Sequence, residues 1–302
     1  MPRHTLDSSS TRGVRLFGLL GNQLFQFALA KALSEDGEPA LLDIGSGDPK
    51  LLLHAVREDA FRTPTYGESR AMLRAPAVRM QRRIQAFMDI QRNTRARSFL
   101  DSRTYVERDW GVFDPEILAT EGPVLFKGYF QREEYFSDVL DAVAASFRPC
   151  SPLAFEILRE SSGRAGKSAV LSVHLRAGAD YARLGWTPHF DWFRRAAEAA
   201  TESLGSVAFV VGSDVPLAAE AFAAAVRDLG PAEALRPAPM YDAMRAISLA
   251  DHSITSPSTF SWWSTWLGDY RTGFDVTRLV LAPAVWVSPP NQPAPVRWTL
   301  VP

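Results

Sequence analysis

The sequence has a single cysteine, no long hydrophobic run and almost no net charge. The lone cysteine, Cys150, excludes an internal disulfide and a cysteine-based zinc site. A net charge of −1 gives no basic excess of the kind that a nucleic-acid-binding domain carries, so we expect no nucleic-acid partner. No run approaches the roughly 18 apolar residues that span a membrane, and the first residues lack the apolar centre of a signal peptide. We therefore expect a cytoplasmic location.

The composition is that of a globular protein of two domains. Hydrophobic residues make up 46% and charged residues 22% of the 302 residues, and a chain of this length is long for one core. A local arginine cluster lies between Arg70 and Arg97. Two interpretations of it stay open, a solvated helical face and a basic surface that makes peripheral contact with an anionic inner membrane.

The first half of the chain begins like a parallel α/β sheet. Residues 1–12 are polar and are expected to form a disordered tail before a domain that covers 13–150. A short apolar run at 13–18, a helical pattern at 22–33 and a second apolar run at 39–45 predict a β-α-β unit. The Arg-rich segment 50–120 has a mostly helical pattern. A strand at 122–130 and a helix at 137–147, capped by Ser137 or Asp138, follow.

The second half, 151–302, alternates more regularly between strands and helices. The domain boundary is placed between Arg148 and Lys167, where Pro149, Pro152 and the loop "SSGRAGK" suggest a connector. Strands that run directly into polar, glycine-containing turns predict a doubly wound α/β domain. The expected strands are 168–176, 206–214, 253–256 and 278–286, and the expected helices are 190–205, 215–230, 240–252 and 259–270.

Candidate ligand-binding residues follow the predicted strands, because open parallel sheets bind ligands beyond the carboxyl ends of their strands. In "VHLRAGADY", His174 and Arg176 lie two residues apart and so share a face at a strand end. The planar guanidinium of Arg176 suits a phosphate, and Gly178 permits a sharp turn after it. A core histidine and a salt-bridging arginine are the structural alternative.

Two further strand ends combine a polar turn with the start of a helix. In "SPSTFSWWSTW", Ser258 or Thr259 is placed to cap a helix whose free N–H groups attract an anion. The tryptophans after them follow helical spacing and are expected in the core. In "GLLGNQ", Gly21-Asn22-Gln23 stands between a strand and a helix, without the spacing of a dinucleotide site or a P-loop. Asn22 is there either a helix cap or a phosphate ligand.

Five segments occur in the order and approximate spacing of the α-1,2-fucosyltransferases of glycosyltransferase family 11. They are "GLLGNQLFQFALAKAL", "GYFQREEYF", "VHLRAGADY", "GSD" and "SPSTFSWWSTWLG". The resemblance runs from Val14 to about Trp286. The chain departs from the family at "RAGAD", where the second arginine of a tandem pair is Ala177 and one residue is inserted before Asp180, and at Leu19, where the family has glycine.

The resemblance implies a GT-B-like α/β fold, in which two Rossmann-like domains with parallel sheets face a central cleft. It implies an inverting transfer of fucose from GDP-fucose to a glycan hydroxyl, galactose O2, with neither a metal ion nor a cofactor. Arg176 would hold the β-phosphate, and His174 with Asp214 or Asp242 would bind the ribose and guanine. The implied donor-binding residues are Gly21, Asn22, Gln23, His174, Arg176, Asp214, Asp242, Ser258, Thr259, Phe260 and Ser261.

The acceptor and the acid–base group follow from the same resemblance. "GYFQREEYF" would bind a glycan or lipid-linked oligosaccharide through Tyr129, Gln131 and Tyr135, in the synthesis of a bacterial surface polysaccharide such as an O-antigen. The implied catalytic residues are Arg176, Asp180 and His174. Asp180 is the candidate general base, and its alternative is a hydrogen bond to its own turn. Two other functions stay open, a catalytically impaired sugar-nucleotide-binding protein and a transferase that uses another nucleotide sugar.

Overall fold

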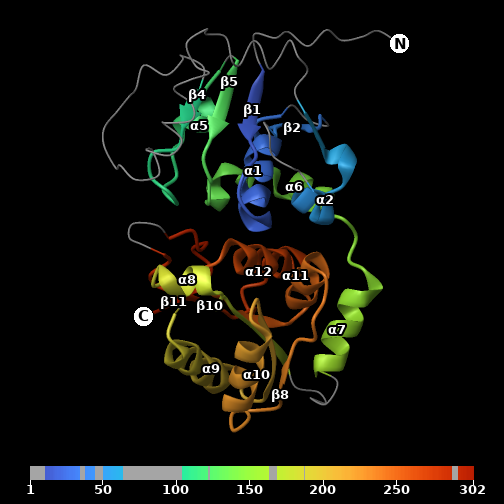
Figure 1. Ribbon diagram of the computed structural model, residues 1–302, viewed down its shortest axis with the longest axis vertical. Helices are drawn as coiled ribbons and strands as arrows, with labels where there is room; N and C mark the ends of the chain where they lie inside the picture. The colour runs from blue at the N-terminus through green and yellow to red at the C-terminus, as the bar shows by residue number, and fades with distance from the viewer. Residues whose placement is uncertain are drawn as a thin grey trace.

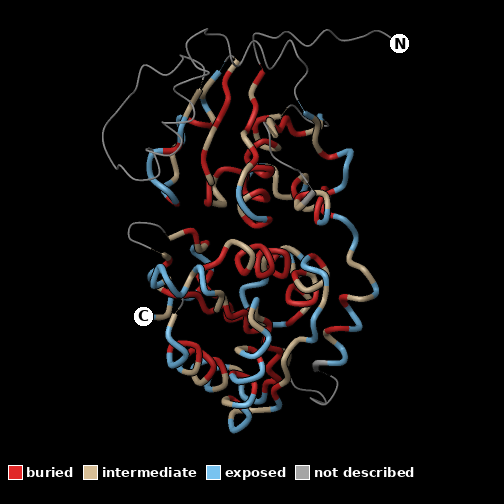
Figure 2. The backbone as a smooth tube through the Cα atoms, viewed as in Figure 1, coloured by how far each residue is buried: buried red, intermediate tan, exposed pale blue. Residues whose placement is uncertain are grey.

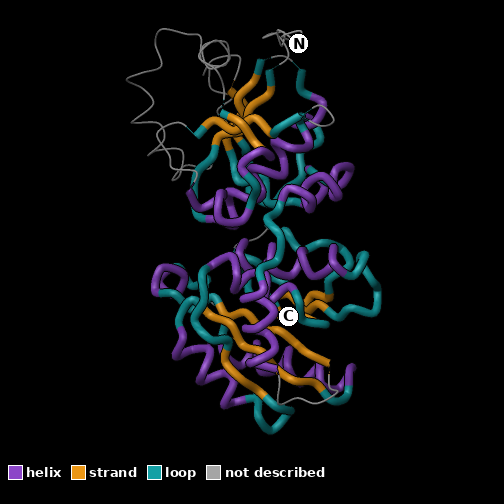
Figure 3. The backbone as a smooth tube through the Cα atoms, turned by 90° about the vertical axis from the view of Figure 1, so that its right-hand side faces the viewer, coloured by secondary structure: helices purple, strands orange, loops and turns teal. Residues whose placement is uncertain are grey.

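The chain folds into two α/β units, each built on one parallel sheet, in a computed structural model (Figure 1). It describes residues 11–34, 38–44, 50–63, 104–121, 123–162, 169–186, 188–287 and 292–302. The arginine cluster from Arg70 to Arg97 lies outside these residues. In the second unit the strands lie inside and helices cover them, whereas in the first unit the described helices lie mainly on the side of the strands that faces the second unit, as the side view shows (Figure 3). The predicted α/β fold of two Rossmann-like units is therefore confirmed.

The first sheet has the strand order β3-β2-β1-β5-β4, and all its pairs are parallel. Its strands are β1 (Arg12–Arg15), β2 (Ala40–Asp43), β3 (Phe61–Arg62), β4 (Thr104–Val106) and β5 (Val124–Lys127). Strands β1, β2 and β5 fall where the sequence predicted strands. Strands β3 and β4 lie in the segment that was expected to be mostly helical, which is a correction.

Helices pack on this sheet through apolar faces. They are α1 (Leu20–Ala32), α2 (Lys50–Ala55), α5 (Glu116–Ala119) and α6 (Leu140–Ser146), with 3₁₀ turns η1 (Glu58–Ala60), η2 (Glu133–Tyr135) and η3 (Ser137–Val139). Helix α1 begins two residues before the predicted start, so Asn22 is not its cap; the N-cap position belongs to Leu19. Neither Ser137 nor Asp138 caps α6 by a side-chain hydrogen bond, because η3 takes up these residues first.

The second sheet has the order β11-β10-β9-β6-β7-β8, also parallel throughout. Its strands are β6 (Ala169–Leu175), β7 (Val207–Ser213), β8 (Ala232–Ala234), β9 (His252–Ile254), β10 (Val280–Pro283) and β11 (Thr299–Val301). Its helices are α7 (Pro152–Ser162), α8 (Ala179–Arg183), α9 (Phe190–Leu204), α10 (Pro216–Ala225), α11 (Met240–Ser248) and α12 (Thr259–Arg271). The sequence did not predict β8, β11, α7 or α8.

The order of each sheet locates its topological switch point, where chain connections leave in opposite directions. In the second sheet β6 lies between β7 and β9, and in the first sheet β1 lies between β2 and β5. Ligands of open α/β sheets bind at such points, beyond the carboxyl ends of the strands. Four of the five motif segments follow β1, β5, β6 and β9, which are the strands on either side of the two switch points, and the fifth, "GSD", lies at the end of β7.

The main hydrophobic core is shared by the two units. It joins residues of α1, β1, β2 and β5 to the tryptophans of α12, and Trp262, Trp263 and Trp266 are fully buried in it. The core position predicted for these tryptophans is confirmed. A second core lies between β6, β7, α9 and α10. In Figure 2 α12 is drawn mostly in the colour of buried residues, on the side of its unit that faces α1.

Candidate functional site

The site is built where the N-terminus of α1 meets the N-terminus of α12. A Cβ atom at Gly21 would come within 2.4 Å of Thr259 Oγ1 and 2.7 Å of the Phe260 nitrogen, so only glycine permits this approach. The indole N–H of Trp263 donates to the Gly21 carbonyl oxygen at 3.1 Å. These contacts bring the predicted donor-binding segments around Gly21 and Thr259 together across the two units.

The glycine-containing loop after β1 is held by its own amide side chains. Gly18 has a φ of 81°, in the left-handed region that favours glycine. The Gln23 side chain is buried and donates through Nε2 to the Gly18 carbonyl oxygen at 3.0 Å, whereas its Oε1 has no partner among the described residues. Gln23 therefore shapes the loop from inside.

Asn22 faces the other strand of this switch point. Its Oδ1 accepts a 3.0 Å hydrogen bond from Gln131 Nε2, in the loop after β5. Gln26 also crosses to that loop, because its Nε2 donates to the Gly128 carbonyl oxygen at 3.0 Å. The two motifs "GLLGNQLFQ" and "GYFQ" are thus one hydrogen-bonded unit. The Asn22 amide N–H₂ group has no hydrogen-bond acceptor among the described residues, so it can donate to a ligand.

His174, the last residue but one of β6, is a buried side chain in a row of polar groups. Its Nδ1 lies 2.5 Å from Ser261 Oγ, and Ser261 Oγ lies 2.8 Å from Ser256 Oγ. Burial lowers the pKa of His174 to about 4, so the imidazole is neutral at pH 7. The ring also contacts the Phe260 ring, with centroids 5.0 Å apart. Ser261 thus contacts the histidine directly.

Arg176, which follows β6, is paired with two carboxylates. Its NH2 group donates to Asp180 Oδ2 at 2.7 Å, its NH1 group donates to Asp214 Oδ2, and its guanidinium lies 4.6 Å from the centroid of the Tyr181 ring. Asp214 also accepts hydrogen bonds from the backbone N–H groups of Ala177 and Gly178, at 2.8 and 3.1 Å. Asp214 therefore fixes the turn that carries Arg176.

The start of α12 presents backbone donors to the same place. Ser258 occupies the N-cap position without a side-chain capping bond, and the Trp262 N–H bonds to its carbonyl oxygen. The first N–H groups of a helix have no intrahelical partner, and the helix dipole adds positive potential there. Thr259 and Phe260 are partly exposed at this terminus. The arrangement can bind an anion beside Arg176 and His174.

Asp242 and Tyr135 have structural partners instead. The Asp242 carboxylate, in the first turn of α11, accepts a hydrogen bond from Ser151 at the start of α7. The Tyr135 hydroxyl donates to the Val112 carbonyl oxygen at 3.2 Å and accepts from the Asp114 N–H at 2.9 Å. Tyr135 is buried, because its hydroxyl makes these hydrogen bonds and its ring packs against the rings of Phe113 and Phe130. It therefore has little surface to offer an acceptor.

Tyr129 lies in an aromatic group at the carboxyl ends of three neighbouring strands. Its ring centroid is 5.0 Å from those of Phe17, after β1, and Trp110, after β4. Trp110 is 41% exposed in the described part of the chain. Aromatic faces of this kind suit the C–H faces of a sugar ring. The sequence did not single out Trp110, because it lies in the segment where no strand was predicted.

Glu107, at the end of β4, is a second residue that the sequence did not single out. Its Oε2 and Oε1 accept the backbone N–H groups of Tyr129 and Phe130, at 2.6 and 3.1 Å. Burial raises the pKa of this carboxyl to about 7. Phe130 has a φ of 52°, so Glu107 holds a strained turn of the "GYFQ" loop in place.

No cluster of three or more His, Cys, Asp or Glu side chains that could hold a metal ion occurs among the described residues. In that same part of the chain, no helix has the length and apolar character of a membrane span.

No protein-family model and no curated protein matches this chain. Among solved structures it is similar to POFUT1 in complex with GDP-fucose, with 16% identity, a TM-score of 0.49, and coverage of 87% of this chain and 95% of that one. It is also similar to fucosyltransferase NodZ from Bradyrhizobium, with 11% identity, a TM-score of 0.45, and coverage of 85% and 93%. Identities and TM-scores this low leave the function to be inferred from the chain's own residues.

Proposed function

We propose that this protein is an inverting glycosyltransferase that moves fucose from GDP-fucose to a hydroxyl of a glycan. One observation carries the proposal. Four of the five segments that resemble fucosyltransferase motifs follow the four strands at the two switch points, and Gly21 of one loop contacts Thr259 of another. A sugar nucleotide bound there would contact both units.

The anionic leaving group, a nucleoside diphosphate, needs positive potential where its charge develops. Arg176 and the N-terminus of α12 supply it, and Asn22 adds amide donors from the other unit. The guanidinium has five N–H donors, of which the two carboxylates engage two. Arg176 can therefore bind a phosphate oxygen while it stays anchored to Asp214. In this proposal protein groups do the work for which other transferases use a metal ion.

The donor's base and ribose are assigned to the same edge of the second sheet. His174, Ser258, Thr259 and Phe260 lie at this edge, and Asp214 is an acidic residue whose charge acts on His174. Asp242 is bound to Ser151, so it is the less favoured partner of guanine. Competition by GDP but not by ADP is the expected outcome of an inhibition assay, because guanine offers two N–H donors to a carboxylate.

The acceptor is assigned to the first unit. Tyr129 and Gln131 follow β5, beside the exposed Trp110, and we propose galactose O2 of a glycan or lipid-linked oligosaccharide as the nucleophile. Asp180 is half-exposed in α8 with one oxygen on Arg176, which leaves its other oxygen for the acceptor hydroxyl. Asp180→Asn should lower kcat roughly 10²-fold with GDP affinity unchanged if the carboxylate is the base. Unchanged kcat would remove it from this role.

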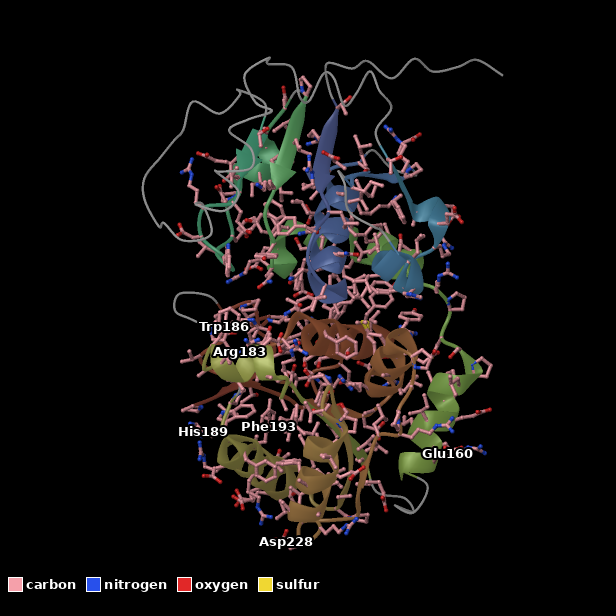
Figure 4. All side chains as sticks on the ribbon, in the orientation of Figure 1. Glu160, Arg183, Trp186, His189, Phe193 and Asp228 are labelled. Atoms are coloured by element: carbon pink, nitrogen blue, oxygen red, sulfur yellow. The ribbon has the colours of Figure 1, made fainter. Side chains whose placement is uncertain are left out.

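The experiment that tests the function is a donor screen that measures released nucleoside diphosphate, run on the wild type, Arg176→Ala and Arg194→Ala. Arg194 is the matched control, because it also binds two carboxylates, Glu198 at i+4 and Asp228. Figure 4 shows Asp228 at the end of the second unit that is remote from α8. Arg183 and Trp186 mark the position of α8 in that view. Loss of one charge-assisted phosphate contact should cost roughly 10²-fold or more in rate. Equal rates in both variants would contradict the assignment.

A second candidate, a sugar-nucleotide-binding protein with impaired turnover, is favoured by one observation. Both carboxylates near Arg176 already compensate its charge, in the segment that departs from the family pattern. Calorimetric binding of GDP-fucose without hydrolysis or transfer across an acceptor panel would favour this candidate. Release of a diphosphate from a different sugar nucleotide in the screen would instead identify another donor.

A further inference from the structure

Three buried polar side chains form a row at the switch point of the second sheet. Ser256 follows β9 and is fully buried, and Ser261 lies in the first turn of α12 with 1% exposure. His174, the last residue but one of β6, is 7% exposed. The hydroxyls of the two serines are 2.8 Å apart, and Ser261 Oγ is 2.5 Å from His174 Nδ1. The Phe260 ring lies against the imidazole and limits its rotation.

The number of protons in this row determines which group donates in each hydrogen bond. Ser256 Oγ has one hydrogen-bond partner among the described residues, Ser261 Oγ, so the Ser256 hydroxyl satisfies its proton by donating to Ser261. Ser261 then has its own proton left for its other partner, Nδ1 of His174. The reverse direction would leave the Ser256 proton buried without an acceptor, which is costly in a site that excludes water.

We propose that Ser256 and Ser261 are positioning residues that hold neutral His174 in the tautomer with its proton on Nε2. Because burial keeps the ring neutral at pH 7, it carries one proton, and a Nδ1 that accepts from Ser261 leaves that proton on Nε2. No described residue accepts a hydrogen bond from Nε2. The imidazole therefore offers one N–H donor to an acceptor oxygen that the described part of the chain does not supply.

The acceptor oxygen belongs to the ligand, a point that rests on the proposed function. The charged neighbours whose fields act on the imidazole are Asp214 and Arg176, and α12 begins beside it. In this environment Nε2–H would donate to a phosphate or hydroxyl oxygen of the sugar nucleotide. His174 with its proton on Nε2 has no free nitrogen for a general base, so its part in the reaction is to bind and orient the donor.

The tautomer can be measured without any ligand. Long-range ¹H–¹⁵N correlation spectra distinguish protonated from unprotonated ring nitrogens, and the chain has 5 histidines, so His174→Gln assigns the signal. We expect an unprotonated Nδ1 and a protonated Nε2 in the wild type at pH 7. A protonated Nδ1 would overturn the inference, whether or not the protein binds a nucleotide.

Two variants test the row, and a third serine serves as the control. Ser256→Ala removes the donor that orients Ser261 although it does not touch the histidine, so a fraction of the Nδ1–H tautomer should appear, as it should in Ser261→Ala. Ser264→Ala is the matched control in the same helix, since the buried Ser264 hydroxyl donates to the Phe260 carbonyl oxygen and not to the row. An unchanged tautomer in Ser261→Ala would overturn the inference. An unchanged tautomer in Ser256→Ala would show that Ser256 does not position the histidine.

Calorimetric titration with GDP separates this inference from the proposed function. Ser261→Ala should weaken GDP binding by about 10-fold, Ser261→Thr should restore it, and Ser264→Ala should leave it unchanged. Equal affinities in all variants would overturn the role of the row in ligand binding. If the wild type binds no GDP, the proposed function fails, while the spectra still decide the tautomer.

Discussion

At the residue scale, Gly21 is a position where the two units approach each other too closely for a side chain. Its missing side chain admits Thr259 and Phe260, and the added methyl group of Gly21→Ala would overlap backbone atoms of both, the nearer 2.6 Å away. Overpacking of this kind costs about 1–3 kcal/mol of unfolding free energy. Denaturant titrations should show that loss, together with weaker GDP binding.

The control for Gly21→Ala is Gly212→Ala, at a buried position whose added Cβ would meet its nearest neighbour, Ile247, at 3.4 Å. It should lose much less stability. A loss as large as that of Gly21→Ala would mean that buried glycines in general, and not the contact between the helix starts, determine the effect.

Glu107 predicts a pH dependence of stability. Its pKa is about 7 in the folded protein against 4.5 as the reference, because burial disfavours the charged carboxylate. Between these values the folded state binds more protons than the unfolded state, so this residue's contribution to stability is complete below about pH 4.5 and is lost as the pH rises through 7.

Glu107→Gln removes that ionisation. The unfolding free energy of the wild type should therefore fall relative to that of the variant as the pH rises from 5 to 8. Glu116→Gln makes the same substitution at an exposed position of α5 and is the control for the change of side chain alone. A constant difference for Glu107→Gln would show that the carboxyl is not titrating in this range.

Sequence reasoning reached the residue types of the site but not their pairings. His174, Arg176 and Ser258 follow apolar strands, so their place at a sheet edge could be predicted from local pattern. The bonds of Asp214 to Ala177 and Gly178, and of Glu107 to Tyr129, join residues more than 20 positions apart. Such pairs depend on the order of strands in the sheet, which the sequence of one chain does not specify.

At the element scale, α12 connects the two units through its tryptophans. The indole N–H groups of Trp262, Trp263 and Trp266 donate to Pro293, Gly21 and Glu133, at 2.9, 3.1 and 2.7 Å. Trp263 also stacks on Phe136 with ring centroids 5.5 Å apart. A stripe of aromatic residues at helical spacing predicted burial but did not reveal that the partner is another unit.

Trp263→Ala should therefore lower the unfolding free energy by about 3–5 kcal/mol, as expected for a large aromatic residue removed from a core. Trp263→Phe should retain much of the packing and lose mainly the bond to Gly21. The exposed Trp110, changed to Ala, is the control for tryptophan loss and should change stability by much less. Urea titrations followed by circular dichroism measure all three, and a small effect at Trp263 would contradict the shared core.

Most of the elements that the sequence missed are short. The exception is α7, a helix of 11 residues whose segment was assigned to the connector because of Pro149 and Pro152. Strand β3 has two residues, β8 reads "AEA", and α8 spans five residues within "RAGADYAR". Pairing with a neighbouring strand, such as Phe209 with Ala232, forms β8 where its own propensity would not. The longer elements α9 and β6 have a clear apolar pattern, and each of their ends lies within one residue of the predicted end.

At the scale of the whole molecule, a charged network joins the units beside the shared core. Arg297 donates to Glu133, in η2 of the first unit, at 2.6 Å and to Asp269 of α12 at 2.8 Å. Asp269 is buried and also accepts from Arg278 and from the Trp298 indole. The network couples a 3₁₀ turn of the first sheet to the last strands of the second.

A shared core and a shared charged network predict that the two units unfold together. Calorimetry should give one transition, with a calorimetric enthalpy equal to the van't Hoff enthalpy, and GDP should raise its midpoint if it binds the folded chain. Arg297→Ala should lower that single midpoint, because it leaves the buried Asp269 with one cation fewer. The control is Arg236→Ala, which removes only exposed pairs with Glu156 and Glu160 and should leave the midpoint unchanged.

Residues 1–150 produced alone would lack the α12 tryptophans that complete their core, so we expect them to expose apolar surface and to melt without cooperativity. Two separate transitions in the full chain, or a cooperative transition in the fragment, would show that each unit is stable by itself and that the contact at Gly21 forms between independently folded parts.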